Sequence, residues 1–191
     1  MHEHLLELIR KEVPVSEEET ALCYTCFEPV VIAKNTIVEA AGKVPKYLYF
    51  VVSGYMRLFH VNERGDEITT HINCPPGFIT AYSGFINQTK AAEQVACITS
   101  CELLRITKQN LDLLVAESTA FRDFSIRVFQ QSIAYNEKRS MELATLSAEE
   151  RYRHLMKNNP GILQQVPLQY IASFLGMNSK SLSRIRKQLI K

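Results

Sequence analysis

The sequence has no tryptophan, no long apolar run and an odd number of cysteines, and these shortages exclude several classes of protein. No uninterrupted apolar stretch approaches the roughly 18 residues that cross a bilayer, so we expect no membrane segment. The first residues, MHEHLLELIRKE, have the pattern of an amphipathic helix and not of a cleavable signal, which predicts a cytoplasmic protein. The five cysteines are irregularly spaced and do not make a disulfide framework, so we expect free thiols.

The composition that remains is that of a globular protein with an uneven distribution of charge. Hydrophobic residues make up 46% and charged residues 22% of the 191 residues, a length that suits two unequal compact units. The net charge is +2, but residues 147–191 hold eight Lys or Arg and two Glu, a balance of +6. The preceding residues hold fourteen basic and eighteen acidic groups, a balance of −4. This concentration of positive charge favours a polyanionic partner such as nucleic acid.

Residues 3–27 have the pattern of helices. Leu5, Leu8 and Ile9 share one apolar stripe, and the pattern breaks at Val13-Pro14. It restarts at Ser16, where a glutamate three residues later completes a capping box, the exchange of hydrogen bonds that begins many helices. We therefore expect helical structure, in two pieces, before the first strand.

From residue 30 to about residue 106, short β-branched and aromatic runs alternate with turn residues. Their spacing of roughly 8–12 residues predicts an antiparallel β-roll or jelly roll. The segment YFVVSGYMRLFHV is the clearest hairpin, because Ser53-Gly54 supplies a turn between two alternating runs. Residues 63–66, Glu-Arg-Gly-Asp, supply the next turn.

After Thr107 the helical pattern returns, and its longest stretch runs from about Ala120 to Leu146. Apolar residues recur there at steps of three and four, for example at Phe121, Phe124 and Val128, which gives a wide apolar face. A wide face needs more than one neighbour. It can pack against the chain's own β-roll or against a partner helix across a two-fold axis, and both interpretations stay open.

A further capping box, Ser147 with Glu150, opens the next helix, and the residues Asn-Asn-Pro-Gly at 158–161 close it. This marks a domain boundary. We expect an effector domain over residues 1–119, a connecting and dimerisation helix over residues 120–146, and a small helical DNA-binding domain over residues 147–191. The predicted fold class is therefore α+β, an antiparallel β-roll with flanking helices.

The segment Leu168 to Leu189 has the pattern of a helix-turn-helix, in which two short helices cross through a tight turn. Ala172 is the small residue where the helices touch, and Gly176 follows in the turn. Pro167 suits the first turn of the opening helix, and Asn178 suits the N-cap of the second. The inward positions are Ile171, Leu175, Met177, Leu182 and Ile185.

The opposite face of the second helix is small, basic and rich in hydrogen-bonding groups. Arginine can make two bonds to guanine and serine can bond several bases, so this face suits a recognition helix in the major groove. The candidate DNA-binding residues are Gln169, Ser179, Lys180, Ser183, Arg184 and Lys187. A solvated basic surface helix would explain the charge but not the complete inward pattern.

The order of these features resembles the Crp/Fnr superfamily, in particular the short regulators common in Bacteroidetes. The resemblance rests on YFVVSGYMRL, PPGF, the long helix, LSAEERY and VPLQYIASFLGMNSKSLSRIRKQL, and it covers nearly the whole chain. It implies a domain of cyclic-nucleotide-binding fold, a homodimer formed through the long helix, and sequence-specific binding to double-stranded DNA. RNA polymerase is a further candidate partner. The sequence given leaves no residues for the β-hairpin wing that follows the recognition helix in many relatives.

Cyclic-nucleotide binders of this superfamily carry a Gly-Glu-Leu segment that bonds the ribose and, about ten residues later, an arginine that pairs with the cyclic phosphate. In an ungapped alignment Ala81 replaces that glutamate and Ala91 replaces that arginine, with Lys90 alongside. Losing both contacts removes several kcal/mol, at roughly 1.5–3 kcal/mol for each hydrogen bond to a charged group, so we expect no cyclic AMP binding. The candidate effector-pocket residues are Ala81, Tyr82, Ser83, Thr89, Lys90 and Ala91.

Cys23 and Cys26 invite comparison with the iron-sulfur sensors of the superfamily. Those sensors need four thiolates, three of them close together near the N-terminus, and here the other cysteines lie on the predicted roll. We therefore expect no iron-sulfur cluster, no other cofactor and no metal, and two free cysteines on a half-buried helix. Haem sensing through His60 or His71 stays an alternative, although single histidines are usually structural.

Two other classes of protein compete with a DNA-binding regulator. A cupin-type metalloenzyme has a similar pattern of short strands and turns. Its metal site needs clustered histidines, and the roll holds only His60 and His71, eleven residues apart. We therefore expect no enzyme activity. A cyclic-nucleotide-binding-fold module that acts through protein partners would leave the C-terminal pattern unexplained.

Overall fold

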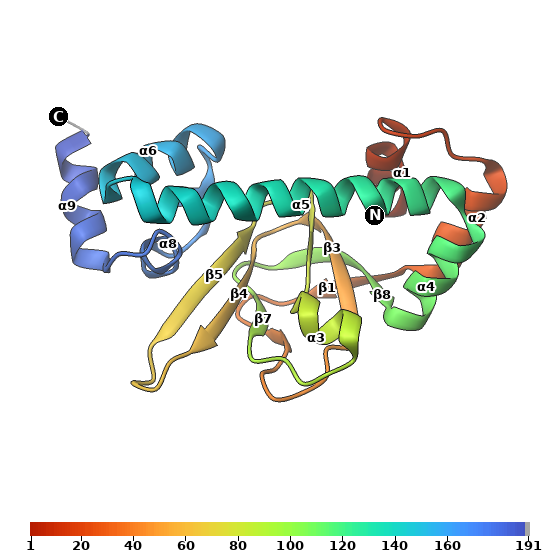
Figure 1. Ribbon diagram of the computed structural model, residues 1–191, viewed down its shortest axis with the longest axis horizontal. Coiled ribbons are helices and arrows are strands. Elements are labelled where there is room, and N and C mark those ends of the chain that lie inside the picture. The colour runs from red at the N-terminus through yellow and green to blue at the C-terminus, as the bar shows by residue number, and fades with distance from the viewer. Residues whose placement is uncertain (190–191) are drawn as a thin grey trace.

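The computed structural model describes residues 1–189 and combines helices with two antiparallel sheets, as the predicted fold class requires (Figure 1). The last two residues of the expected domain 147–191 lie outside the described part of the chain. The strands are β1 (Glu28–Ile32), β2 (Ile37–Glu39), β3 (Tyr47–Ser53), β4 (Met56–Val61), β5 (Glu67–Asn73), β6 (Gly77–Ile79), β7 (Gln94–Cys97) and β8 (Cys101–Thr107). The helices are α1 (His2–Arg10), α2 (Glu17–Cys26), α3 (Tyr82–Asn87), α4 (Lys108–Glu117), α5 (Thr119–Thr145), α6 (Ala148–Asn158), α7 (Ile162–Gln165), α8 (Leu168–Phe174) and α9 (Ser179–Leu189).

The strands form two four-stranded sheets, in the order β1-β8-β3-β6 and β2-β7-β4-β5, which confirms the predicted β-roll. The hairpin predicted around Ser53-Gly54 is wrong, because β3 and β4 belong to different sheets and do not pair. Gly54, at φ +89°, instead carries the chain from one sheet to the other, and a Cβ there would lie 2.4 Å from the Ser100 carbonyl oxygen. The turn expected at residues 63–66 does join a hairpin, formed by β4 and β5.

The space between the two sheets is filled by a core of apolar side chains. Tyr49, Val51, Met56 and Leu103 are at most 3% exposed in this core. One carboxylate, that of Glu39, is buried beside them, and it accepts hydrogen bonds from the Tyr49 hydroxyl at 3.0 Å and from two backbone N–H groups, those of residues 46 and 47. The interior of the roll is therefore occupied by its own side chains, and its buried charge is fully bonded.

The N-terminal helices pack together with the start of α5. The predicted capping box of Ser16 and Glu19 is present at the start of α2. Glu19 also accepts hydrogen bonds from the Ser118 hydroxyl at 2.6 Å and the Ala120 N–H at 3.0 Å, which joins α2 to the first turn of α5. One carboxylate thus fixes the direction in which the long helix leaves the roll.

Helix α5 matches the long helix expected over residues 120–146 to within one residue at each end, and it runs along the length of the molecule in Figure 1. Its first turns are buried against the chain's own core, at Ala120, Phe121 and Phe124. Further along, large apolar side chains are exposed, among them Ile126 at 49% and Ile133 at 68%. The chain's own core therefore covers only the beginning of the wide apolar face.

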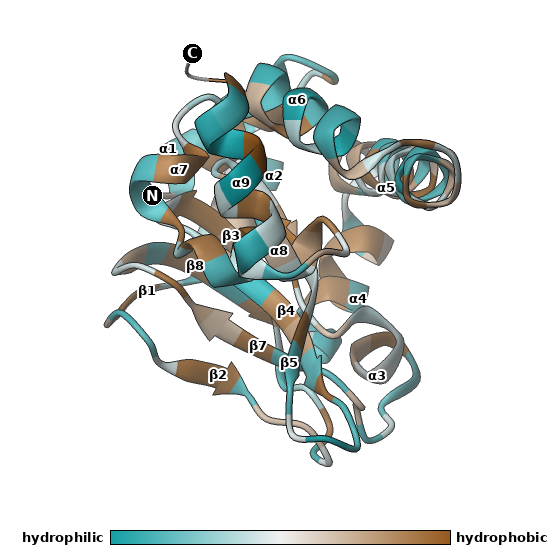
Figure 2. Ribbon diagram, turned by 90° about the vertical axis from the view of Figure 1, so that its left-hand side faces the viewer, coloured by the Kyte–Doolittle hydropathy of each residue, from teal (hydrophilic) through white to brown (hydrophobic). Residues whose placement is uncertain are grey.

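The C-terminal helices α6 to α9 form a core of their own, which also includes Ile72 and Ile98 from the roll. Figure 2 shows these helices above the end of the roll. The second predicted capping box, Ser147 with Glu150, begins α6, and Asn159 ends that helix as expected. Within the described residues, no helix is both long enough and apolar enough to cross a bilayer.

Candidate nucleic-acid interface

Helices α8 and α9 are joined by a tight turn with the features that the sequence predicts. Gly176 adopts φ +67°, a left-handed conformation that favours glycine, and the Met177 N–H bonds the Ala172 carbonyl at 3.0 Å. The Asn178 side-chain oxygen accepts a hydrogen bond from the Ser181 N–H at 2.8 Å, so it caps the start of α9. Pro167 departs slightly from expectation, because it lies at the N-cap of α8, with extended ψ 136°, and not in the first helical turn.

The inward side of this pair of helices is apolar. Ile171, Leu175, Leu182 and Ile185 are buried, at 7% exposure or less, and Met177 is half-buried against the same core. Phe174 belongs to the same core at 6% exposure, although it is not one of the predicted inward positions. Burial of one side of α9 leaves the opposite side directed to solvent.

Helix α9 carries five of the six residues predicted to bind DNA, and the sixth, Gln169, lies on α8. Five of the six, Gln169, Ser179, Lys180, Arg184 and Lys187, are exposed, and Ser183 is half-buried. Arg186, which was not among the predicted DNA-binding residues, is half-buried, and its Nε atom has no hydrogen-bond partner among the described residues. Helix α9 contains no acidic residue, so four cationic side chains act together along its eleven residues.

The predicted effector-pocket residues differ in their exposure. Ala81 and Ala91 are 3% and 8% exposed and belong to the core of the roll. A Cβ on Gly84 of α3 would lie 3.1 Å from the Ala91 Cβ, so α3 packs directly on this segment. The other four predicted residues are exposed, and the Tyr82 ring packs edge-on against Phe129 of α5 with centroids 5.6 Å apart.

The cysteines are free thiols, Cys23 and Cys26 lie in buried positions, and the His71 ring is half-buried. Cys23 and Cys26 are buried on α2, more deeply than the half-buried position expected, and burial raises the pKa of the Cys23 thiol to about 12. All five cysteines are free. Burial, together with the charge of Arg139, lowers the pKa of His71 to about 4. Among residues 1–189, no three His, Cys, Asp or Glu side chains gather at a point that could hold a metal ion.

Polar and aromatic contacts hold α8 against the roll, and no local sequence pattern predicts them. The guanidinium group of Arg57, a buried residue of β4, lies 3.8 Å from the Phe59 ring centroid and 3.6 Å from that of Tyr170 on α8. Arg57 also pairs with Glu67 at 2.5 Å. The Ser173 hydroxyl of α8 accepts a hydrogen bond from the Thr69 N–H of β5 at 2.9 Å. These contacts fix the orientation of the exposed face of α9 relative to the roll.

Comparison with known proteins places the fold in a family. Residues 29–118 match the model of the cyclic nucleotide-binding domain. FixK2 from Bradyrhizobium japonicum has a similar structure, with a TM-score of 0.72 and 14% identity over 85% of this chain and 84% of the other. The Xanthomonas campestris protein CLP, described as a c-di-GMP responsive global regulator, has a TM-score of 0.64 and 17% identity over 91% of each chain. The Thermus thermophilus catabolite activator protein has a TM-score of 0.55 and 19% identity over 92% of this chain and 84% of the other.

Residues 29–118 thus match the cyclic nucleotide-binding domain, and the chain has the fold of the Crp/Fnr family of transcriptional regulators. The resemblance stated from the sequence is confirmed at this level. The sequence matches none of the curated proteins. The likeness in structure covers the helices after the β-roll as well, because it extends over 85–92% of the chain in these three comparisons.

Proposed function

We propose that this chain is a sequence-specific DNA-binding transcription regulator that acts as a homodimer. The observation that carries the proposal is the exposed face of α9, where Lys180, Arg184 and Lys187 lie on the side opposite the buried Leu182 and Ile185. A capped helix with one apolar side and one basic side can enter the major groove while its core contacts hold it in place. The regulators whose fold it shares support the same function.

The residues of this face have different positions along α9 and therefore different tasks. Ser179 and Lys180 lie at the N-terminal end, which enters the groove first, and Gln169 at the start of α8 is placed for the DNA backbone. Arg184 lies near the middle of α9 beside Ser183, where its planar guanidinium can bond guanine O6 and N7. Lys187 lies almost one turn further on and contacts a phosphate.

The exposed apolar side chains of α5 support the homodimer. Ile126, Phe129 and Ile133 are spaced at i, i+3 and i+7 and are 38–68% exposed, so they form a stripe that a second copy of α5 can cover. In this proposal residues 1–119 form the effector domain, residues 120–146 the dimerisation helix and residues 147–191 the DNA-binding domain. Two recognition helices would then be presented about one DNA turn, ~34 Å, apart. Sedimentation should give twice the chain mass of 21.8 kDa, and a monomer at micromolar concentration would contradict the dimer.

The effector domain in this proposal does not bind cyclic AMP in its roll. Ala81 and Ala91 stand where binders of the superfamily have a glutamate and an arginine, and both alanines are packed in the core between the sheets. Neither side chain can bond a ribose hydroxyl or a cyclic phosphate. Lys90 is exposed, and a single lysine supplies a point charge without the paired donors of an arginine.

The proposed DNA contacts can be tested by comparing Arg184→Ala with Lys187→Ala. Both variants are titrated with an operator selected from random duplexes and with a scrambled duplex, over a range of salt concentrations. Arg184→Ala should cost about 1–3 kcal/mol on the operator and little on the scrambled duplex. Lys187→Ala should weaken both duplexes alike and reduce the slope of log affinity against log salt by about one per subunit.

The two variants act as controls for each other, because each removes one positive charge from the same helix. If Arg184→Ala weakens binding to both duplexes equally, Arg184 contacts phosphate, and Ser179 and Lys180 become the candidates for contacts with the bases. If neither variant changes DNA binding, the face of α9 is not the interface and the proposed function loses its main support.

A further inference from the structure

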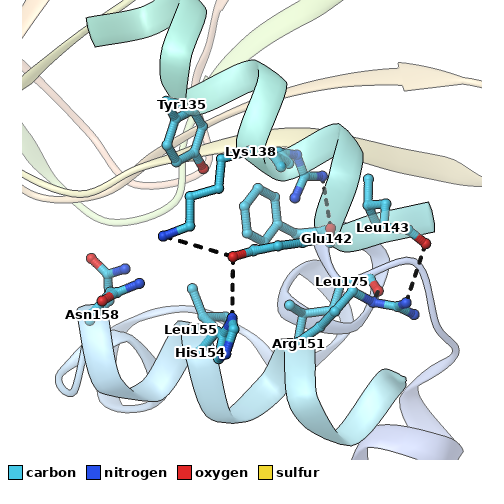
Figure 3. Close-up of a pocket in the computed structure, with 12 residues that line it drawn as sticks. Tyr135, Lys138, Glu142, Leu143, Arg151, His154, Leu155, Asn158 and Leu175 are labelled. Atoms are coloured by element: carbon cyan, nitrogen blue, oxygen red, sulfur yellow. Dashed lines mark hydrogen bonds and ion pairs between the residues drawn. The ribbon is translucent and has the colours of Figure 1, made fainter. Parts of the chain in front are cut away.

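Two adjoining cavities, of about 190 Å³ and 120 Å³, lie where the roll, α5 and the C-terminal helices meet. They share four lining residues, and we call them together the junction cavity. The shared residues are Tyr135, Leu155, Asn159 and Phe174. Figure 3 shows the smaller cavity between α5 and α6. The junction cavity is separate from the face of α9 and from the interior of the roll.

One side of the larger cavity is polar and includes a residue whose hydrogen-bond donor has no partner among the described residues. His71, Asn73 and Cys74, at the end of β5, line it. Asn73 is only 5% exposed, and its side-chain Nδ2 is buried without a hydrogen-bond partner among the described residues. A Cβ on Gly77 would lie 2.7 Å from Asn73 Oδ1, so the amide occupies a space that only glycine leaves open. Buried polar groups nearly always have a partner, and an unpaired donor on a residue that lines a cavity suits an acceptor on a ligand.

The smaller cavity carries an excess of positive charge. Lys138, Arg139 and Arg151 line it, against one carboxylate, that of Glu142. The two arginines already donate to backbone carbonyls, Arg139 to Phe174 at 2.8 Å and Arg151 to Leu175 at 2.9 Å. The Lys138 ammonium group has only a long ion pair, because its nearest carboxylate oxygen, on Glu142, is 3.9 Å away. Figure 3 shows this ammonium group directed across the cavity, between Glu142 and Asn158.

We propose that the junction cavity binds a small organic anion. Its acidic group would lie beside Lys138, and an acceptor oxygen would take the hydrogen bond that Asn73 Nδ2 offers. Neither cavity alone, at about 190 Å³ and 120 Å³, reaches the ~300–1,000 Å³ typical of pockets for drug-sized ligands, so we expect a small occupant. Carboxylates and phosphate esters share this chemistry.

Because of where the junction cavity lies, a ligand bound there would affect how the surrounding parts of the chain are arranged. The walls of the cavity come from β5, from α5, and from α6 and α8, three parts of the chain that meet here. A ligand bound to all three favours the arrangement in which they are close together, because binding shifts the equilibrium toward the state with the better contacts. The binding site itself does not depend on the proposed DNA-binding function.

Nuclear magnetic resonance of the full ¹⁵N-labelled chain tests this proposal. The chain is titrated at constant ionic strength with succinate, with glycerol 3-phosphate, and with neutral succinamide. At least one anion should shift the side-chain amide signals of Asn73 with a dissociation constant of about 1 mM or lower, and succinamide should not. The anion that binds more tightly shows whether the acidic group is a carboxylate or a phosphate.

Two lysine variants separate specific binding from general attraction of anions. Lys138→Gln should weaken binding about tenfold. Lys34→Gln removes the same charge from the exposed connection between β1 and β2, outside the cavity, and should leave binding unchanged. Three results would overturn the proposal: no shift at Asn73 with either anion up to about 10 mM, equal binding of succinamide, or equal weakening by the two variants.

Discussion

The interior of the roll and the junction between the roll and the C-terminal helices are both bordered by several elements, but they are filled in different ways. In the roll, Val51 and Leu103 are fully buried, and the Glu39 carboxylate has three hydrogen-bond donors. At the junction, a cavity of about 190 Å³ remains, and the amide nitrogen of Asn73, which lines this cavity, is buried without a partner among the described residues. The interior of the roll is packed with the roll's own side chains, while open polar space lies at its boundary with the C-terminal helices.

The largest expected effect comes from removing a side chain of the roll interior. Leu103→Ala should lower the free energy of unfolding by about 2–5 kcal/mol, because the filled core cannot collapse around the space that is left. Urea denaturation of both proteins measures this difference. Leu113→Ala is the matched control, since Leu113 of α4 is 46% exposed, and it should change the free energy by no more than about 0.5 kcal/mol. Equal effects would show that the roll is not tightly packed.

Acidification should weaken the junction through His71. Burial and the charge of Arg139 lower its pKa from 6.5 to about 4, and it also packs edge-on against the Tyr135 ring. Between these pH values the unfolded chain binds more protons, so the free energy of unfolding falls as pH falls from 6.5 to 4. The contribution is fully present above pH 6.5 and amounts to roughly 3 kcal/mol.

The His71 contribution can be isolated by comparing the protein with His71→Asn in urea denaturation at several pH values. The difference between the two proteins should change over the range from pH 6.5 to 4 and stay constant above it. Parallel pH profiles would show that His71 titrates normally in the folded chain.

A smaller effect is expected where the Arg57 guanidinium group packs against the Tyr170 ring, 3.6 Å from its centroid. Tyr170→Leu removes the aromatic face from the buried cation and should cost about 1 kcal/mol of unfolding free energy. Tyr170→Phe keeps the ring, and its stability should match that of the unaltered chain. If Tyr170→Leu and Tyr170→Phe change the free energy of unfolding equally, contact area and not the aromatic face holds α8 on the roll.

The smallest effect is expected for Asn73→Ala. Asn73 is as deeply buried as many core residues, but its amide nitrogen makes no hydrogen bond in the folded chain that would be lost. The free energy of unfolding should stay within about 1 kcal/mol of the unaltered value, because the cost of the lost contacts is offset by removing an unpaired buried donor. A loss above about 2 kcal/mol would mean that this amide is satisfied after all.

Features that depend on a few neighbouring residues could be predicted from the sequence. The capping boxes at Ser16 and Ser147 and the cap at Asn178 are present where the local pattern placed them. The inward residues Leu182 and Ile185 of α9 follow from helical spacing alone. Because these signals lie within one or two turns of a helix, the remainder of the fold does not alter them.

Features that depend on distant segments could not be predicted in this way. Ser53-Gly54 has the same local pattern whether the chain folds back into one sheet or crosses to the other, and in the fold the distant residue Ser100 lies against Gly54. The junction cavity joins His71, Tyr135 and Asn159, which lie far apart in the sequence. No periodicity or motif connects these residues, so only the folded chain brings them together.

Calorimetry with cyclic AMP tests the contrast between the two regions most directly. With Ala81 and Ala91 packed in the core of the roll, we expect no specific heat of binding at cyclic AMP concentrations below about 100 μM, which corresponds to a binding free energy weaker than about −5.5 kcal/mol. A micromolar dissociation constant with one site per chain would contradict this, because it would show that the roll opens a nucleotide pocket where the folded chain has packed side chains.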